Sequence, residues 1–256
     1  MALIGVSGKI GSGKDLVGDI INFLTSEYYT PSEYSINYTL EDSFKDFQDY
    51  TIIDYKHKFE IKKFADKLKD IVCMLIGCSR KDLENREFKE KPLEKQWWNF
   101  SLGGGKRYVL PYIGEYSDSD RKIMEGRYEE KMTPRLMLQL LGTEAGRQVI
   151  HQNIWVNALF SDYNKTYNWV ITDVRFTNEA DVILEKGGIV IRINRPCKEC
   201  NGVSNHKLDC SIGRVEHLSE KSLDDYGKFS YIVDNVGTIP DLIHMIKNIL
   251  KKENII

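Results

Sequence analysis

Three residues near the amino terminus, Gly8, Gly13 and Lys14, have the spacing of the G-x-x-x-x-G-K loop that binds nucleotide phosphates. Such a loop surrounds a phosphate with its own N–H groups, which leaves no room for Cβ atoms, and the lysine adds a positive charge. The Ser or Thr that usually follows the lysine and contacts Mg²⁺ is Asp15 here. Asp15 is a candidate to bind the metal directly or through water, to cap the following helix, or to hold the loop. An ordinary glycine-rich turn is the alternative to a phosphate site.

The segments on both sides of this phosphate loop (residues 8–14) favour phosphate binding. Residues 3–6 are apolar and predict a buried strand, and residues 16–24 repeat apolar side chains at helical spacing. The motif requires a strand, a loop and a helix in this order. A helix that begins at the loop also points the positive end of its dipole at the bound anion.

A second group of candidate residues follows the apolar run 168–172. Asp173 would lie at the carboxyl end of that strand, which is the edge of a parallel sheet where ligands bind. It is therefore a candidate to hold Mg²⁺ or to orient a nucleophile, with Arg175 beside it to bind anions. The alternative is that Asp173 caps the next helix, which we expect over residues 178–186.

Basic residues elsewhere are further candidates for phosphate contacts. Arg135 and Arg147 flank the segment 142–144, where we expect a helix to break or bend. Lys69 comes early in a helix expected over residues 65–76. For all three, the alternative is an ordinary solvated side chain.

The remaining patterns predict an α/β protein in which a parallel sheet carries helices on both faces. We expect one domain over residues 1–256, with an inserted, mostly helical subdomain over 79–132 and a lid-like loop over 197–222. The segment 27–55 has weak periodicity and is expected to be irregular. The other expected elements are strands over 59–64, 189–193 and 231–235, and a final helix that includes 242–249.

The charge balance and the cysteine count limit the class of protein. Lys and Arg number 36 and Asp and Glu 38, so the net charge of −2 gives no general attraction to nucleic acid. Five cysteines in 256 residues favour a reduced compartment over a disulfide framework. No apolar run reaches the 18 residues of a membrane span. We therefore expect a cytoplasmic protein that binds neither membranes nor nucleic acid.

A cysteine–histidine cluster near the carboxyl-terminal third superficially resembles a zinc knuckle. Its intervals differ from those that zinc coordination requires, so reduced thiols in a loop are expected and zinc binding stays open. The cluster consists of Cys197, Cys200, His206 and Cys210.

A phosphate loop, an acidic strand end and several arginines are the parts used in phosphoryl transfer, where positioning and electrostatics supply most of the catalysis. A small-molecule kinase is favoured over hydrolysis that drives motion, since the chain has no basic stripe and no switch pattern. Several stretches together resemble the bacteriophage-type deoxynucleoside monophosphate kinases. They are residues 7–15, 64–69, 135–144, Trp155, 173–179 and 234–239.

The resemblance implies a three-layer P-loop fold and the ATP-dependent phosphorylation of deoxynucleoside 5′-monophosphates to diphosphates, with Mg²⁺, for DNA precursor synthesis. A viral source would place this activity in the host cell cytoplasm. The ATP-binding residues would be Gly8, Gly11, Ser12, Gly13, Lys14, Asp15, Leu16, Val17 and Asn235. The acceptor-binding residues would be Leu68, Lys69, Arg86, Arg135, Gly142, Trp155, Asp173, Arg175 and Glu179. The metal ligands would be Asp15 and Asp173, and the catalytic residues Lys14, Arg135, Asp173 and Arg175.

Two other functions stay open. One is a different small-molecule kinase on the same scaffold, such as a dephospho-coenzyme A kinase or a cytidylate kinase. The other is a non-catalytic nucleotide-binding or nucleic-acid-binding module in which the cysteine–histidine cluster holds a metal. The sequence does not decide which bases are accepted, whether ribose is excluded, or whether the chain is a monomer or a homodimer.

Overall fold

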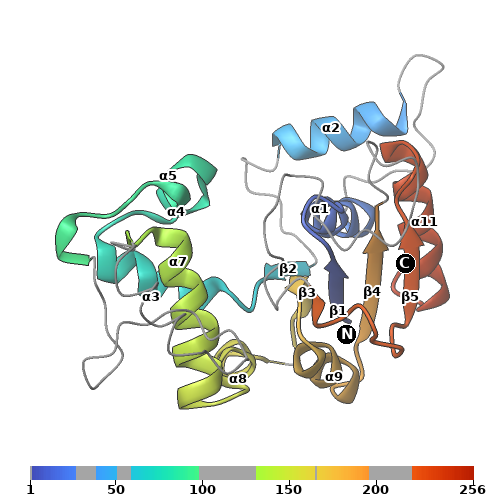
Figure 1. Cartoon of the computed structure of the whole chain (residues 1–256). Coiled ribbons are helices and arrows are strands. Elements are labelled where there is room, and N and C mark those ends of the chain that lie inside the picture. The colour runs from blue at the N-terminus through green and yellow to red at the C-terminus, as the bar shows by residue number, and fades with distance from the viewer. Residues whose placement is uncertain (1, 27–38, 51–58, 98–130, 165, 196–220) are drawn as a thin grey trace. The chain divides into compact units, whose positions relative to one another are not determined.

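The computed structural model describes residues 2–26, 39–50, 59–97, 131–164, 166–195 and 221–256. The chain divides into two compact units (Figure 1). The sheet unit contains residues 1–64 and 156–256, and the helical unit contains residues 65–155. The cysteine–histidine cluster, most of the expected lid-like loop 197–222 and much of the expected subdomain 79–132 lie outside the described residues. The bounds of that loop and subdomain stay predictions.

The sheet unit is built on a five-stranded, fully parallel sheet in the order β2-β3-β1-β4-β5. The central strand, β1, is almost entirely buried, as expected of a parallel strand covered on both faces. It pairs with β3 through Gly5 and Ile171 and with β4 through Gly5 and Val190. The strands are β1 (Leu3–Gly8), β2 (Phe59–Lys62), β3 (Asn168–Val174), β4 (Ile189–Asn194) and β5 (Tyr231–Asp234).

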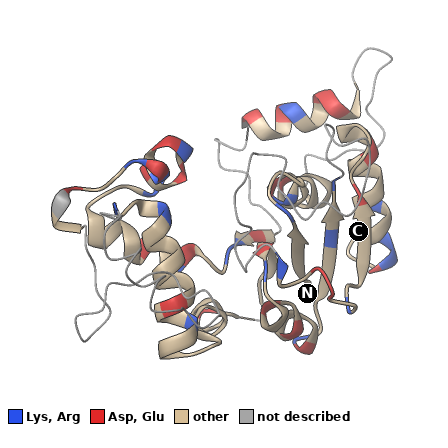
Figure 2. Cartoon of the chain, in the orientation of Figure 1, with Lys and Arg blue, Asp and Glu red and all other residues tan. Residues whose placement is uncertain are grey.

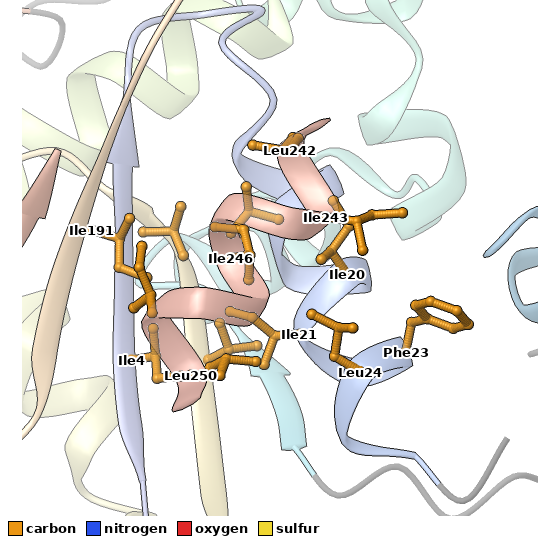
Figure 3. Packing of buried hydrophobic residues seen from close by; sticks show 14 of the residues in the cluster. Ile4, Ile20, Ile21, Phe23, Leu24, Ile191, Leu242, Ile243, Ile246 and Leu250 are labelled. Carbon is orange, nitrogen blue, oxygen red and sulfur yellow. The ribbon is translucent and has the colours of Figure 1, made fainter. Parts of the chain in front are cut away.

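Helices cover both faces of this sheet, which confirms the expected α/β class. On one face, α1 and α11 pack against each other and against the sheet, and Ile20, Ile21, Ile243 and Ile246 meet between them (Figure 3). On the other face, α9 contributes Ile183 to a separate core cluster. The helices are α1 (Lys14–Thr25), α2 (Leu40–Tyr50), α8 (Ile154–Phe160), α9 (Thr177–Glu185) and α11 (Ile239–Lys252).

The helical unit has its own small core. Leu68 and Val72 of α3 pack with Leu83, Met137 and Trp155. The short helices α4 and α5 carry charges of both signs close together (Figure 2). The elements are α3 (Asp66–Ile76), α4 (Arg80–Glu84), α5 (Arg86–Glu90), a 3₁₀ turn η1 (Lys95–Trp97), α7 (Pro134–Gln139) and a π-helix η2 (Leu140–Ile150).

The expectation that segment 27–55 is irregular is wrong for α2. Most residues of this helix are polar, but Phe44 and Phe47 are buried and Leu40 is partly buried against the same core cluster. The rings of Phe44 and Phe47 lie 5.4 and 5.5 Å from the ring of Phe23 on α1. Leu40, Phe44 and Phe47 have helical spacing and pack on one core cluster, so a short apolar side holds a helix that is otherwise polar.

The expected break at 142–144 is also replaced by a helix. The chain continues from α7 into the π-helix, which ends only at Ile150. Val149 and Ile150, near the end of this helix, are 78% and 65% exposed. Among the described residues, no helix combines the length and the apolar character that crossing a membrane requires.

Candidate active site

The phosphate loop connects β1 to α1 in the sheet unit, and its glycines have steric reasons to be there. Gly13 forms the N-cap of α1 with φ 100°, a left-handed conformation that strains other residues. A Cβ atom on Gly8 would lie 2.4 Å from Ser12 Oγ and 2.6 Å from the carbonyl oxygen of Ile193. Larger residues at these two positions would therefore change the path of the loop.

Lys14 begins α1, and its side chain turns back along the loop. Its ammonium group donates to the carbonyl oxygens of Gly8 at 2.6 Å and Lys9 at 2.7 Å. The side chain is only 9% exposed, so the charge is fixed within the loop. Leu16 and Val17, which follow Asp15, pack in or against the core. A contact between either of them and ATP stays a prediction.

Asn235 supports the phosphate loop from the turn that follows β5. Its side-chain amide donates to the carbonyl oxygen of Ser12 at 3.0 Å, and the residue is 8% exposed. Its backbone N–H donates to the carbonyl of Asn194 at 2.7 Å, which fixes the turn against β4. Asn235 therefore holds the loop in shape, and its expected contact with ATP stays a prediction.

Asp15 follows Lys14 and lies in a charged, hydrogen-bonded setting. Its Oδ1 atom is 2.8 Å from the ammonium of Lys63 and accepts a 3.0 Å hydrogen bond from the hydroxyl of Thr172. Partial burial acts to raise the pKa of the Asp15 carboxyl, but the hydrogen bonds and positive charges around it outweigh this effect and lower the pKa. The side chain is nevertheless 73% exposed, so the carboxylate also faces solvent.

Asp173 lies near the end of β3 and is held by the chain that follows β2. Its Oδ1 atom accepts a 2.8 Å hydrogen bond from the backbone N–H of Phe64. The N-cap residue of α9 is Phe176, and Glu179 accepts from the N–H groups of Arg175 and Phe176 at 2.7 and 3.1 Å. The carboxylate of Glu179 thereby fixes the backbone at Arg175. Its contact with a substrate stays a prediction.

The two carboxylates fit a magnesium ion that is bound together with a nucleotide. Among the described residues, no group of three His, Cys, Asp or Glu side chains could hold a metal alone. Mg²⁺ does not require such a group, since it keeps several waters and binds one or two carboxylates plus phosphate oxygens. Asp15 and Asp173 supply that kind of donor set. Two consecutive residues after β2 contact the two carboxylates, Lys63 that of Asp15 and the N–H of Phe64 that of Asp173. Thr172 on β3 also contacts Asp15.

The expected acceptor residues of the helical unit form two groups. Leu68, Gly142 and Trp155 lie together, because the indole N–H of Trp155 donates to the carbonyl of Gly142 at 2.7 Å. A Cβ atom on Gly142 would lie 2.8 Å from the side chain of Leu68. The basic residues form ion pairs within this unit: Lys69 with Glu84 at 2.6 Å and Arg135 with Glu90 at 2.5 Å. Arg86, the first residue of α5, is exposed.

The structure adds residues that the sequence did not single out. Lys63 contacts Asp15, and only its position directly before the family-like stretch 64–69 could have pointed to it. Arg192 on β4 donates to the hydroxyl of Ser7 at 3.1 Å and pairs with Asp224 at 3.2 Å. Asp224 also pairs with Lys9 of the phosphate loop at 3.3 Å. Arg192 could have been found from the sequence, because an arginine within an otherwise apolar strand is unusual.

Comparisons with known proteins match more than half of the chain. The family model described as deoxynucleotide monophosphate kinase matches residues 106–245. The deoxynucleoside-5′-monophosphate kinase of Escherichia phage T5 is 29% identical over 204 residues, which are 72% of this chain and 72% of the phage protein. A protein of Acanthamoeba polyphaga mimivirus, provisionally named a deoxynucleotide monophosphate kinase, is 38% identical over 105 residues. That match covers 36% of this chain and 51% of the mimivirus protein.

Proposed function

The chain belongs to the deoxynucleotide monophosphate kinase family, and we propose that it uses ATP, bound at its phosphate loop, as the phosphoryl donor. It is a phosphotransferase that acts on deoxynucleoside monophosphates. The observation that supports ATP binding is the loop itself: a glycine N-cap, the start of α1 and a buried lysine ammonium lie at the carboxyl end of the central strand. The reaction makes the deoxynucleoside diphosphate and ADP.

Each part of the loop has a role in this proposal. The loop N–H groups and Lys14 bind the β- and γ-phosphates and hold them in line with the acceptor. A phosphate oxygen of the deoxynucleoside monophosphate attacks the γ-phosphorus. The bond from that phosphorus to the β–γ bridging oxygen then breaks, and ADP leaves with the electron pair. Asp15 and Asp173 would hold Mg²⁺, which when bound supplies positive charge to the phosphate oxygens.

Acceptor contacts are proposed for residues of the sheet unit and, separately, for residues of the helical unit. In the sheet unit, Arg175 would neutralise phosphate charge, and its backbone is fixed by Glu179. In the helical unit, Arg135 and Lys69 are the corresponding cations, and each is held by an acidic partner. Trp155 and Leu68 are buried in the core of this unit and would shape the acceptor site. Two further expectations stay predictions: a location in the cytoplasm of a host cell, and the formation of a homodimer.

The decisive experiment is the substitution Lys14→Ala, assayed by ADP formation with ATP and each deoxynucleoside monophosphate. We expect activity to fall at least 100-fold with an unchanged circular dichroism spectrum, since one fixed charge on the transferring group is lost. Lys62→Ala is the matched control, because Lys62 pairs with Glu60 at 2.7 Å and should leave the activity unchanged. If Lys14→Ala works at the parental rate, the phosphate loop is not the ATP site.

The same assay separates the alternative kinases. CMP and dephospho-coenzyme A are added to the panel of acceptors, and the expected result is turnover with deoxynucleoside monophosphates only. Faster turnover with CMP or dephospho-coenzyme A would reassign the acceptor. Equal rates with dCMP and CMP would show that ribose is not excluded.

A further inference from the structure

An acidic residue directly follows the phosphate loop, at a position where its charge should weaken the binding of a phosphate. Asp15 is the first residue after the loop lysine, and its carboxylate is mostly exposed. A carboxylate close to a bound triphosphate repels it, because like charges at short distance raise the free energy of the complex. The usual Ser or Thr at this position has no such effect. The structure must therefore supply a counter-charge if the site is to bind ATP.

Lys63 supplies that charge, and its position is fixed on both sides. It directly follows β2, which ends at Lys62. Its neighbour Phe64 is buried in the core, and the N–H of Phe64 is bonded to Asp173. The Lys63 ammonium lies 2.8 Å from Asp15 Oδ1, the same oxygen that accepts from Thr172. The pair thus has two anchored partners, unlike most surface ion pairs, whose mobile side chains make them weak.

The adjacent lysine shows the contrast. Lys62 pairs with Glu60 two residues earlier on the same strand, and neither residue contacts the phosphate loop in the described contacts. Consecutive residues of a strand point to opposite sides, so only one of the two lysines can be directed to Asp15. Lys62 and Lys63 therefore differ in what they neutralise, although they have the same chemistry and nearly the same exposure.

We propose that Lys63 is a positioning residue of the phosphate site, which neutralises Asp15 so that the loop can accept a nucleoside triphosphate in the absence of a divalent cation. This inference rests on the proposed binding of ATP at the loop. A cation held by Asp15 would provide the same neutralisation, so Lys63 matters most for metal-free ATP. Lys63 acts through Asp15 and is not assigned a contact with the reacting atoms.

The test is the affinity for ATP, measured by isothermal titration calorimetry in EDTA and again in excess Mg²⁺. The proteins are the parental chain, Lys63→Met, Lys63→Arg, Asp15→Asn and the double variant Lys63→Met with Asp15→Asn. We expect Lys63→Met to weaken binding of metal-free ATP about five- to tenfold, because the Asp15 charge next to the loop would be unpaired at high effective permittivity. Lys63→Arg should restore the affinity to within about twofold.

The double variant identifies the route of the effect. Without the carboxylate at position 15, the counter-charge is not needed, so the double variant should bind metal-free ATP as Asp15→Asn does. In Mg²⁺ the penalty of Lys63→Met should shrink to less than about threefold. Lys62→Met is the control and should bind as the parental chain does. Thermal unfolding of each variant, followed by circular dichroism, reports any loss of fold.

The outcomes distinguish a failure of this inference from a failure of the proposed function. If Lys63→Met binds metal-free ATP as tightly as the parental chain, the inference is overturned. If the double variant binds as weakly as Lys63→Met, Lys63 acts on the fold or on ATP directly, which also overturns it. If the parental chain binds no ATP, or if Lys14→Ala binds it equally well, the proposed function fails instead.

Discussion

Asn235 offers the sharpest test of how the sheet positions the phosphate loop. Its amide donates to the carbonyl of Ser12 in a buried setting, 223 residues away in the sequence. In Asn235→Asp the side chain keeps its shape but loses the donor and places a negative oxygen against that carbonyl. An unsatisfied buried acceptor costs about 1–3 kcal/mol, and the charge adds to this. We therefore expect the free energy of unfolding to fall by about 2–4 kcal/mol.

The loop should suffer as well as the fold, because the lost bond holds the carbonyl of Ser12 next to the N-cap of α1. A carboxylate at position 235 also adds a negative charge beside a phosphate site. We expect kcat/KM for ATP to fall at least tenfold, from steady-state ADP formation, while urea unfolding gives the stability. Asn235→Ala removes the donor without the charge and should cost about 1–2 kcal/mol.

Asn194→Ala is the matched control for both variants. This asparagine ends the neighbouring strand β4, is exposed, and its side-chain amide donates to the exposed Asp234 at 3.2 Å. The loss of an exposed hydrogen bond should change stability by less than about 0.5 kcal/mol and leave kcat/KM for ATP unchanged. A parental urea midpoint together with a parental kcat/KM in Asn235→Asp would refute the idea that this side chain holds the loop.

Two further predictions concern stability. Trp155→Phe removes the buried N–H that donates to Gly142, so we expect a loss of about 1–2 kcal/mol in urea unfolding; an unchanged midpoint would mean that the π-helix does not depend on this bond. The hydrogen bond from Lys228 holds the pKa of Asp181 below its usual value, with a second hydrogen bond from Tyr226, so this pair stabilises the fold above pH 3.8 and the effect is lost as the pH falls through the lowered pKa. Asp181→Asn should therefore cost about 0.5–1 kcal/mol at pH 7 and close to nothing at pH 2 in urea unfolding, and a difference that persists at pH 2 would contradict this assignment.

The elements that the sequence predicts well are those whose pattern is local. The strand at residues 3–8 and the helix after it carry continuous or periodic apolar residues. Thr133 followed by Pro134 is another local pattern, typical of a helix start, and in the structure Thr133 accepts from the N–H of Leu136 at the start of α7. The helix α2 was missed because most of its residues are polar, and only Leu40, Phe44 and Phe47 form its apolar side. For a helix this polar, contact with α1 decides the structure.

The π-helix shows a different limit of sequence reasoning. The segment 142–144, which begins with a glycine, suggested a break or bend, because glycine destabilises a helix interior. Another glycine follows at 146. In the structure both glycines allow close contacts instead. A Cβ atom on Gly142 would meet Leu68 at 2.8 Å, and one on Gly146 would lie 3.0 Å from the ring of Trp155. The π-helix therefore depends on packing against Leu68 and Trp155, which lie outside it, and the sequence of the segment alone does not predict it.

The candidate site depends in the same way on a strand register that no local pattern contains. The pairing of Lys62 with Ile171 in β2 and β3 brings the next residues of both strands side by side. Lys63 then reaches Asp15 from one strand and Thr172 reaches the same oxygen from the other, while the N–H of Phe64 reaches Asp173. A slip of one residue would send each side chain to the opposite face of the sheet. The two carboxylates are thus positioned as one group by the β2–β3 register, and a substitution that disturbs this register would affect both.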